Sequence, residues 1–407
     1  MREMKDSGIC WIGEYPQAWV LAALKRYVKV HNGAEILSEV SSYDHNSVPV
    51  YGSGGVFKHT THAQYEGEAV LFGRKGTLGK PIYATGKMWA VDTMYLLSHN
   101  EALLPRFNFY QLSAFNWEPW ITHTAIPSIV ASDIVAQKFP IPPLHEQHRI
   151  TNYLDRKCTD IDDVLEKTRT SIDKYKNLKQ SVITEAVTKG IRGERPMKDS
   201  GSAWFGNIPE TWDANKLKYT FTIRKRIVGE DGHTVLAITQ KGVKPKDMSN
   251  GNGQFAESYA NYQIVNPGDF AMNHMDLLTG WVDISKYEGV TSPDYRVFTL
   301  DDTTRNCPGY YLYMMQMCYS NRIFYSMGQG VSGMGRWRLP ADMFNNFIIA
   351  CPPFEEQQEI AEYLDKKCSE IDSLIASKEK FITELESYKK SLIYEYVTGK
   401  KEVPAEA

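Results

Sequence analysis

The stretch of sequence that decides the fold occurs twice. It reads Pro142-Pro143-Leu144-His145-Glu146-Gln147 in the first half of the chain and Pro352-Pro353-Phe354-Glu355-Glu356-Gln357 in the second. The two copies lie 210 residues apart, and residues at this offset continue to match as far as Thr188 and Thr398. Because a missed repeat leads to the wrong fold, we treat the chain as two halves that end alike.

Each copy opens a segment without glycine or proline, 144–189 in the first half and 354–398 in the second. Since glycine and proline interrupt helices, each segment predicts one long helix that ends at Gly190 or Gly399. About 43 residues at ~1.5 Å per residue give a rod of roughly 65 Å. The apolar side chains step by three and four residues, which is the spacing of a coiled coil: Ile150, Leu154, Cys158, Ile161, Leu165, Ile172, Tyr175, Leu178 and Val182, then Ile360, Leu364, Cys368, Ile371, Ile375, Ile382, Leu385, Tyr388 and Leu392.

Symmetry predicts how the two helices pair. Both stripes carry a polar residue near the middle, Thr168 and Lys378, and a repeated chain closes most easily around a pseudo-twofold axis. We therefore predict an antiparallel coiled coil that crosses near these residues and separates Cys158 from Cys368 by roughly 30 Å. Parallel pairing would bring the two cysteines together, and two helices buried in separate cores are a further alternative.

A second repeat precedes each globular region. Met4-Lys5-Asp6-Ser7-Gly8 recurs as Met197-Lys198-Asp199-Ser200-Gly201, at an offset of 193 residues. The same offset relates four further positions in each half: Trp11, Gly13, Pro16 and Trp19, then Trp204, Gly206, Pro209 and Trp212. Residues 20–140 and 213–350, by contrast, show little similarity. Each half is therefore a lead-in, a divergent domain and a similar helix.

These boundaries predict an α+β protein with internal pseudo-twofold symmetry. The two mixed α/β domains span 1–143 and 191–353. The two long helices span 144–190 and 354–400, and a tail spans 401–407. Apolar and aromatic runs between glycine-rich turns predict strands at 69–72, 94–97, 235–238 and 295–300. Helices are expected at 107–115 and 310–325.

Composition limits the class of protein. The 407 residues include 46 Lys and Arg against 49 Asp and Glu, and the net charge is -3. A protein that holds nucleic acid by overall charge would be basic, so such a role requires local patches or a basic partner. No apolar run approaches the roughly 20 residues of a membrane span, and the six cysteines show no CxxC spacing. We expect a cytoplasmic protein with reduced thiols.

Catalytic motifs are not found in the sequence. Gly52-Ser53-Gly54-Gly55 lacks the context of a nucleotide loop and predicts a turn, and Asn266-Pro267-Gly268-Asp269 predicts a turn that leads into a strand. The pairs His59/His62 and His145/His148 have no third ligand nearby. The sequence also has no Walker A motif and no G-x-S-x-G elbow. The obvious arrangements for catalysis and for metal binding are therefore missing, while a Ser/His/Asp triad stays open.

Three loops have the chemistry to contact DNA. Gly73–Lys80 combines glycines with Arg74, Lys75, Thr77 and Lys80, which suit phosphates and the edge of guanine. The segments 240–246 and 330–338 offer a similar mixture in the second domain, with these candidate residues: Lys241, Lys244, Arg336 and Arg338. Solvated hairpin tips are the alternative interpretation of each loop.

The whole pattern resembles the DNA-specificity subunit of Type I restriction-modification systems. The resemblance rests on the two Pro-Pro-x-x-Glu-Gln stretches with their helices and on the lead-ins at Trp11-Ile12-Gly13 and Trp204-Phe205-Gly206. Further segments of the domains also look like that family: Gly73-Arg74-Lys75-Gly76, Ala90-Val91-Asp92-Thr93, Gly268-Asp269-Phe270, Met275-Asp276-Leu277-Leu278-Thr279-Gly280-Trp281 and Ser292-Pro293-Asp294-Tyr295. The second domain lacks a Gly-Arg-Lys-Gly, so its contacts are less well defined.

The resemblance implies that this chain is not an enzyme and binds no cofactor or metal itself. Each domain would read one half of a split site in double-stranded DNA, and the helices would set the distance between the halves. Partner subunits would supply the chemistry: adenine methyltransferase (M) subunits with S-adenosylmethionine, and restriction (R) translocase and endonuclease subunits with ATP and Mg. Four residues near the helix starts are candidates for docking the methyltransferases, with a helix-start cap as the alternative: Glu146, Gln147, Glu356 and Gln357. A tandem-domain coiled-coil scaffold is the alternative function, and an enzyme that acts alone is a remote third.

Overall fold

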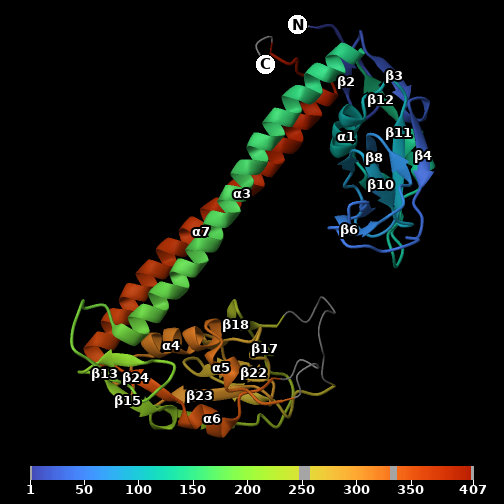
Figure 1. Ribbon diagram of the computed structural model, residues 1–407. Helices are drawn as coiled ribbons and strands as arrows, with labels where there is room; N and C mark the ends of the chain where they lie inside the picture. Colours follow the sequence, from blue (N-terminus) through green and yellow to red (C-terminus); the bar gives the residue numbers. More distant parts are fainter. Residues whose placement is uncertain (1, 247–256, 331–336, 405–407) are drawn as a thin grey trace. The chain divides into compact units, whose positions relative to one another are not determined.

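The chain forms two compact units (Figure 1). The computed structural model describes residues 2–246, 257–330 and 337–404. The first unit comprises Met1–Arg169 with Glu379–Ala407, and the second comprises Thr170–Lys378. Each unit therefore contains a part of both long helices.

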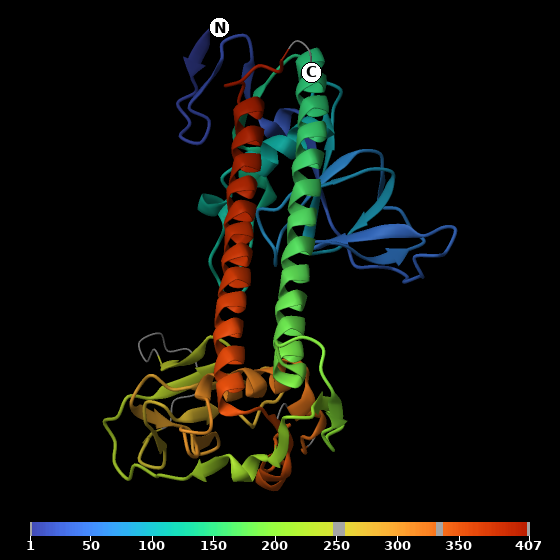
Figure 2. The same cartoon turned by 90° about the vertical axis from the view of Figure 1, so that its left-hand side faces the viewer.

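Both long helices that the sequence predicts are present. Helix α3 spans Leu144–Lys189 and helix α7 spans Phe354–Val397. In the first unit, side chains of α3 contact side chains of α7. The ring centroids of Tyr153 and Tyr396 lie 4.7 Å apart, and Asp162 accepts a hydrogen bond from Lys389 at 2.6 Å. Later residues of α3 thus contact earlier residues of α7 within this unit, where the two helices lie side by side (Figure 2).

The second unit repeats this contact with the roles of the helices exchanged. Lys179 of α3 donates to Asp372 of α7 at 2.7 Å, and these residues lie 210 positions from Lys389 and Asp162 in the sequence. The ammonium group of Lys378 lies 5.7 Å from the ring centroid of Tyr175. The same pair of charges therefore closes the helix interface in both units.

Most positions of the apolar stripe are buried, five are half-buried and two are exposed. Leu178 and Tyr388 keep 48% and 56% of their surface exposed, so the prediction that they face the partner helix is wrong. A helix turn of 3.6 residues allows a step of four in place of three at this point. Lys179 and Lys389 therefore occupy the inward positions in place of Leu178 and Tyr388. Their stems are half-buried, and their ammonium groups form the ion pairs with aspartate.

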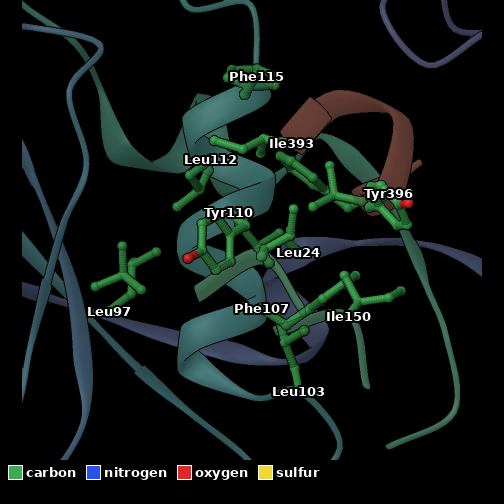
Figure 3. Close-up of a cluster of buried hydrophobic side chains, with 14 of the residues drawn as sticks. Leu24, Leu97, Leu103, Phe107, Tyr110, Leu112, Phe115, Ile150, Ile393 and Tyr396 are labelled. Carbon is green, nitrogen blue, oxygen red and sulfur yellow. The ribbon is translucent and has the colours of Figure 1, made fainter. Parts of the chain in front are cut away.

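The core of the first unit is built on a four-stranded antiparallel sheet with the order β4-β11-β8-β9. Its strands are β4 (Val28–Asn32), β8 (Ala69–Gly73), β9 (Ile82–Ala84) and β11 (Met94–His99). Helix α1 (Pro105–Ala114) packs its Phe107 and Tyr110 into a cluster with Ile150 of α3 and Ile393 of α7 (Figure 3). The long helices therefore pack into the hydrophobic core of the domain as well as against each other.

Smaller elements complete the first unit. A second sheet has the order β6-β5-β10-β7 and contains β5 (Val48–Gly52), β6 (Gly55–Thr60), β7 (Tyr65–Glu66) and β10 (Lys87–Ala90). The other elements are β1 (Met4–Asp6), β2 (Glu14–Pro16), β3 (Val20–Ala23), β12 (Lys138–Ile141), α2 (Ala131–Val135) and the 3-10 turns Leu24–Arg26 and Glu118–Trp120. Strand β1 pairs with β2, and β3 pairs with β12.

The second unit is built on a similar antiparallel sheet with the order β16-β23-β20-β21. Its strands are β16 (Phe221–Arg224), β20 (Phe270–Met272), β21 (Val282–Ile284) and β23 (Arg296–Leu300). The other strands form the pairs β13 (Met197–Asp199) with β14 (Asn207–Pro209), β15 (Asp213–Lys216) with β24 (Ile348–Cys351), β17 (Leu236–Thr239) with β18 (Gly242–Pro245), and β19 (Gln263–Val265) with β22 (Gly289–Thr291). Helices are α4 (Pro308–Ser320), α5 (Ile323–Ser326), α6 (Ala341–Asn346) and the 3-10 turn Leu217–Tyr219.

The mixed α+β prediction is confirmed, and so are the predicted strands, to within one residue at their starts. The helix predicted at 107–115 is α1. The helix predicted at 310–325 is broken between α4 and α5, where Arg322 has a left-handed backbone with φ of 56°. The amide of Asn321 next to it donates to Thr184 and accepts from Gln180, both on α3, at 3.0 and 2.5 Å. The contact with the long helix replaces a further helical turn.

Candidate nucleic-acid interface

The loop between β8 and β9 carries the cations that the sequence predicts for the first domain. Arg74, Lys75, Thr77 and Lys80 are all exposed. None of the three cations forms an ion pair with another residue that the structure describes. The guanidinium of Arg74 lies 6.0 Å from the ring centroid of Tyr95 on β11. The loop therefore offers unneutralised positive charge to a polyanion.

The backbone of this loop is held in place. The amides of Arg74 and Lys75 donate to the carbonyl of Thr93 at 2.8 and 3.3 Å, and the carbonyl of Arg74 accepts from Ile129 at 3.0 Å. A Cβ on Gly73 would stand 2.5 Å from the carbonyl oxygen of Thr77, so the tight return of the loop requires glycine. The fixed backbone therefore holds the exposed side chains at defined starting points, as a recognition site needs.

The glycine-rich stretch at residues 52–55 also lies here, as a turn. It joins β5 to β6, as predicted, and the hydroxyl of Ser53 accepts a hydrogen bond from the amide of Thr77 at 3.3 Å. The predicted turn at 266–269 leads into β20 in the second unit. Neither stretch has the setting of a nucleotide site.

The second domain has an equivalent loop, residues 273–281, between β20 and β21. Strand β20 pairs with β23 as β8 pairs with β11. The carbonyl of His274 accepts from the amide of Leu339 at 2.9 Å, as Arg74 accepts from Ile129. Leu339 lies 210 residues after Ile129, so His274 occupies the place of Arg74.

The chemistry of the two loops differs. Loop 273–281 contains no lysine or arginine, and the cation is on the strand instead: Arg296 occupies the place of Tyr95. Arg296 is buried and donates to the carbonyl of Leu339 at 2.9 Å. Burial, Arg296 and Arg338 together lower the pKa of His274 to about 3, which keeps its ring neutral. In the first domain the loop carries the cation and the strand carries the ring. In the second domain the loop carries the ring and the strand carries the cation.

The predicted cations of the second domain flank this loop. Lys241 and Lys244 are exposed on the β17–β18 hairpin and form no ion pair with a described residue. The side chain of Gln240 donates to the carbonyl of Thr279 at 3.5 Å, which brings the hairpin tip to the loop. Arg338 is exposed on the other side, where its neighbour Trp337 accepts from Leu277 at 3.3 Å. Arg336 lies outside the described residues.

The four candidate docking residues do not face outward. Gln147 and Gln357 are buried and bind backbone groups of the domain that precedes each helix: the amides of Leu104 and Cys307, both at 2.8 Å, and the carbonyls of Ala102, Pro142, Arg305 and Pro352. Glu356 is buried, and Glu146 keeps 17% of its side chain exposed. The burial contradicts the expected docking surface. These side chains join domain to helix.

An arginine, a tryptophan and the motif glutamate form the same cluster in each unit. Arg2 and Trp19 donate to Glu146 at 2.5 and 2.8 Å. In the second unit Arg195 and Trp212 donate to Glu356 at 2.5 and 3.0 Å. Arg2 and Arg195 were missed by the sequence analysis, although they share the offset of 193 residues with the tryptophans. That shared offset was the signal that could have revealed them.

A groove of about 1270 Å³ lies beside loop 273–281, within the second unit. Its walls include Leu278 and Trp281 of the loop, Gln240 of the hairpin and Lys176 of α3. Lys176 and Arg322, which also lines the groove, are exposed and form no ion pair with a described residue. The groove therefore combines the tip of the loop with free positive charge.

Among the described residues, no group of three histidine, cysteine, aspartate or glutamate side chains is placed to hold a metal ion. No described helix is both long enough and apolar enough to cross a membrane.

Comparison with known proteins identifies the family. The model of the Type I restriction modification DNA specificity domain matches residues 16–174 and 157–387. The chain therefore belongs to the family of Type I restriction-modification DNA specificity proteins.

Individual relatives agree with this assignment. The type I restriction enzyme specificity subunit S.HindORF215P of Haemophilus influenzae is 23% identical over 79% of this chain and 80% of its own length. The type I restriction enzyme MjaVIII specificity subunit of Methanocaldococcus jannaschii is 24% identical over 68% of this chain and 65% of its own length. A solved chain of a type I restriction-modification system shares the fold with a TM-score of 0.65, at 13% identity over 95% of this chain and 99% of that chain.

Proposed function

We propose that this chain is the DNA-specificity subunit of a Type I restriction-modification complex and that each domain reads one half of a bipartite, asymmetric site in double-stranded DNA. The observation that carries the proposal is the pair of equivalent loops, 74–81 and 273–281, which have the same place in similar sheets and different side chains. Domains with one frame and unlike reading loops would recognise unlike sequences.

In the first domain the reader is Arg74. The backbone of Arg74 is fixed, and its exposed guanidinium forms no ion pair with a described residue, so it can donate two hydrogen bonds to guanine in the major groove. Lys75, Thr77 and Lys80 would contact phosphates and set the register of the domain on the duplex. In the second domain Lys241, Lys244 and Arg338 take that positioning role beside loop 273–281. Arg336 remains a candidate of the same kind.

The helices would act as the ruler between the half-sites. We infer that they form one antiparallel coiled coil with pseudo-twofold symmetry, because the repeated ion pairs support it: Asp162 with Lys389 and Lys179 with Asp372. The repeated arginine, tryptophan and glutamate clusters would fix each domain to the start of its helix. A rigid connection is what a fixed spacing between two half-sites needs.

Partner subunits would bind the outer surface of the helices. Large apolar side chains stay exposed among charged ones, Val164, Phe381 and Tyr388 in the first unit and Leu178 and Leu374 in the second. Phe381 and Tyr388 are seven residues apart and share a helix face. Such exposed apolar side chains are typical of protein interaction sites, and we assign them to the adenine methyltransferase subunits in place of Glu146, Gln147, Glu356 and Gln357.

The chemistry would reside in the partners. S-adenosylmethionine would be bound by the methyltransferase subunits, and ATP and Mg by the restriction translocase and endonuclease subunits. The role of this chain is to bind the duplex and to position those subunits on it, without a catalytic step of its own.

Single-molecule sequencing of genomic DNA tests the function directly. We expect that the host with this gene carries methyl-adenine in one split motif, and that deletion of the gene removes this motif alone. Purification of the chain from the same host would recover the methyltransferase subunit. An unchanged methylome in a host whose methyltransferase is active and bound to this chain would contradict the proposal and favour a scaffold.

A further inference from the structure

The tip of loop 273–281 is a rigid turn. One carboxylate oxygen of Asp276 accepts from the amides of Leu278 and Thr279 at 3.0 and 2.9 Å, and the other accepts from the hydroxyl of Thr279. A Cβ on Gly280 would stand 2.0 Å from the carbonyl oxygen of Asp276, so only glycine closes the turn. The backbone of the tip is therefore fixed before any ligand binds, and so is the point from which Leu278 projects.

This turn presents an apolar side chain. Leu278 is 58% exposed, whereas its neighbour Leu277 is 1% exposed and belongs to the core of the unit. A single exposed leucine is ordinary on a protein surface, but this one has a fixed backbone and lies in the loop that corresponds to the cationic loop of the first domain. Its place in the fold gives it a candidate role.

The surroundings of Leu278 suit a nucleic-acid duplex. It lines the groove with Gln240, Lys176 and Arg322, and the hairpin that carries Lys241 contacts the loop through Gln240. The nearest carboxylates of the loop and of β21 are engaged internally, since Asp276 closes the turn and Asp283 accepts from the amide of Val243 at 3.1 Å. Two carboxylates also line the groove, and both are engaged: Asp365 accepts from the hydroxyl of Tyr313, and Asp372 pairs with Lys179, each at 2.7 Å. The apolar tip therefore lies beside an amide and two cations without an ion pair among the described residues, Lys176 and Arg322.

We propose that Leu278 reads the C5 methyl group of a thymine in the major groove of the second half-site. The thymine methyl is the apolar feature of the major groove, and apolar side chains discriminate it from cytosine and from purines. Lys241, Lys176 and Arg322 supply phosphate contacts around it. The inference rests on the proposed function and adds the class of base that the second domain reads: the first domain reads with a cation and the second with an apolar contact.

The test replaces thymine by uracil, which lacks only the methyl group. The complete complex with its methyltransferase subunits is bound to duplexes that carry the motif found by sequencing, with one uracil at each thymine of the second half-site in turn. We expect one uracil to weaken binding by about fourfold, the effect of burying one methyl-sized group. Uracil in the first half-site, at positions read by hydrogen bonds, leaves affinity unchanged.

Variants connect the effect to the residue. Leu278→Ala should bind the thymine duplex about fourfold more weakly and should no longer distinguish uracil from thymine, whereas Leu278→Met should retain the discrimination. Leu37→Ala removes another exposed leucine, at 72% exposure, from the first unit and serves as the control, because it should change neither value.

Three outcomes would overturn the proposal: a second half-site without thymine on either strand, a wild-type complex indifferent to every uracil, or a Leu278→Ala complex that still prefers thymine. Loss of affinity in Leu278→Ala together with indifference to uracil would show that the side chain is a wedge between base steps and not a methyl reader. A complex that binds neither half-site specifically would refute the proposed function itself, and the two failures are therefore distinguishable.

Discussion

Arg74 in the first domain projects from its loop over the ring of Tyr95, whereas in the second domain the ring of His274 stands on the loop and the cation, Arg296, comes from the strand beneath. The cluster of arginine, tryptophan and glutamate, by contrast, has the same hydrogen bonds in both units. Residues that join domain to helix have many partners and admit few replacements, since a change leaves a buried polar group unpaired. Residues on the loops have few partners within the chain, and their chemistry is free to follow the DNA.

The largest expected effect concerns the clusters of arginine, tryptophan and glutamate that join each domain to its helix. We predict that Glu356→Ala destabilises the second unit by about 3–5 kcal/mol, because it removes a buried carboxylate. The change leaves the indole N–H of Trp212 without its acceptor and leaves the half-buried Arg195 with only the carbonyl of Lys189. Glu146→Ala should cost the first unit less, about 1–3 kcal/mol, since Glu146 is partly exposed and Arg2 keeps an ion pair with Glu402 at 2.9 Å.

Denaturant unfolding monitored by tryptophan fluorescence measures both losses. Glu355→Ala and His145→Ala change exposed neighbours on the same helix turns and should leave the midpoints within about 0.5 kcal/mol. Equal losses for Glu356→Ala and Glu146→Ala would show that burial of the cluster does not determine its contribution.

The next effect separates the reading loops. Arg74→Ala should reduce discrimination at one base pair of the first half-site by about 1–3 kcal/mol, and the second half-site should be unchanged, because His274 fills the corresponding place without a contact of this kind. Sequencing of methylated DNA from cells that carry the variant shows the motif directly. Arg74→Lys, which keeps the charge and loses the planar fork, should also relax that base pair. Relaxation in both halves would refute the assignment of one domain to one half-site.

Local sequence predicted the frame better than the loops. The long helices are visible because periodicity and the lack of glycine and proline are local signals. Glu356 was expected on the surface because its partners are distant, with Arg195 161 residues and Trp212 144 residues away in the sequence. The equivalence of His274 with Arg74 depends on which strands pair and on the hydrogen bond from Leu339. The repeat offset could have revealed the arginines of the cluster, but no local pattern predicts which strands pair or that Leu339 binds His274.

The stability of both domains should decrease as the pH falls, and the pH at which this decrease ends should differ between them. Burial lowers the pKa of His99 in the first unit to about 4, and burial with Arg296 and Arg338 lowers that of His274 to about 3. Both values lie below the ordinary 6.5, so the unfolded chain binds more protons below that pH. The stability that each neutral histidine contributes is complete above pH 6.5 and falls as the pH decreases, until the folded-state pKa is reached.

The slope is at most about 1.4 kcal/mol per pH unit for each histidine. Unfolding by denaturant between pH 7.5 and pH 5 measures it, and His274→Gln should flatten the slope of the second unit and leave that of the first unchanged. His99→Gln should do the reverse. A slope that survives both substitutions would mean that other groups cause the acid sensitivity.

The smallest effect tests whether the ion pairs between the two long helices are equally strong in the two units. Lys389→Met and Lys179→Met each remove one end of an ion pair whose aspartate is more than half exposed, Asp162 and Asp372 respectively. Each should cost only about 0.2–1 kcal/mol, because water already screens such charges, and the loss should shrink in 1 M salt. The methionine retains the apolar stem that occupies the inward position, so the measurement isolates the charge. Double-mutant cycles with Asp162→Asn and Asp372→Asn should give the same coupling energy in both units if the helix interface follows the pseudo-twofold axis. Unequal coupling would mean that the two helices share the spacing of their residues but not the energetics of their interface.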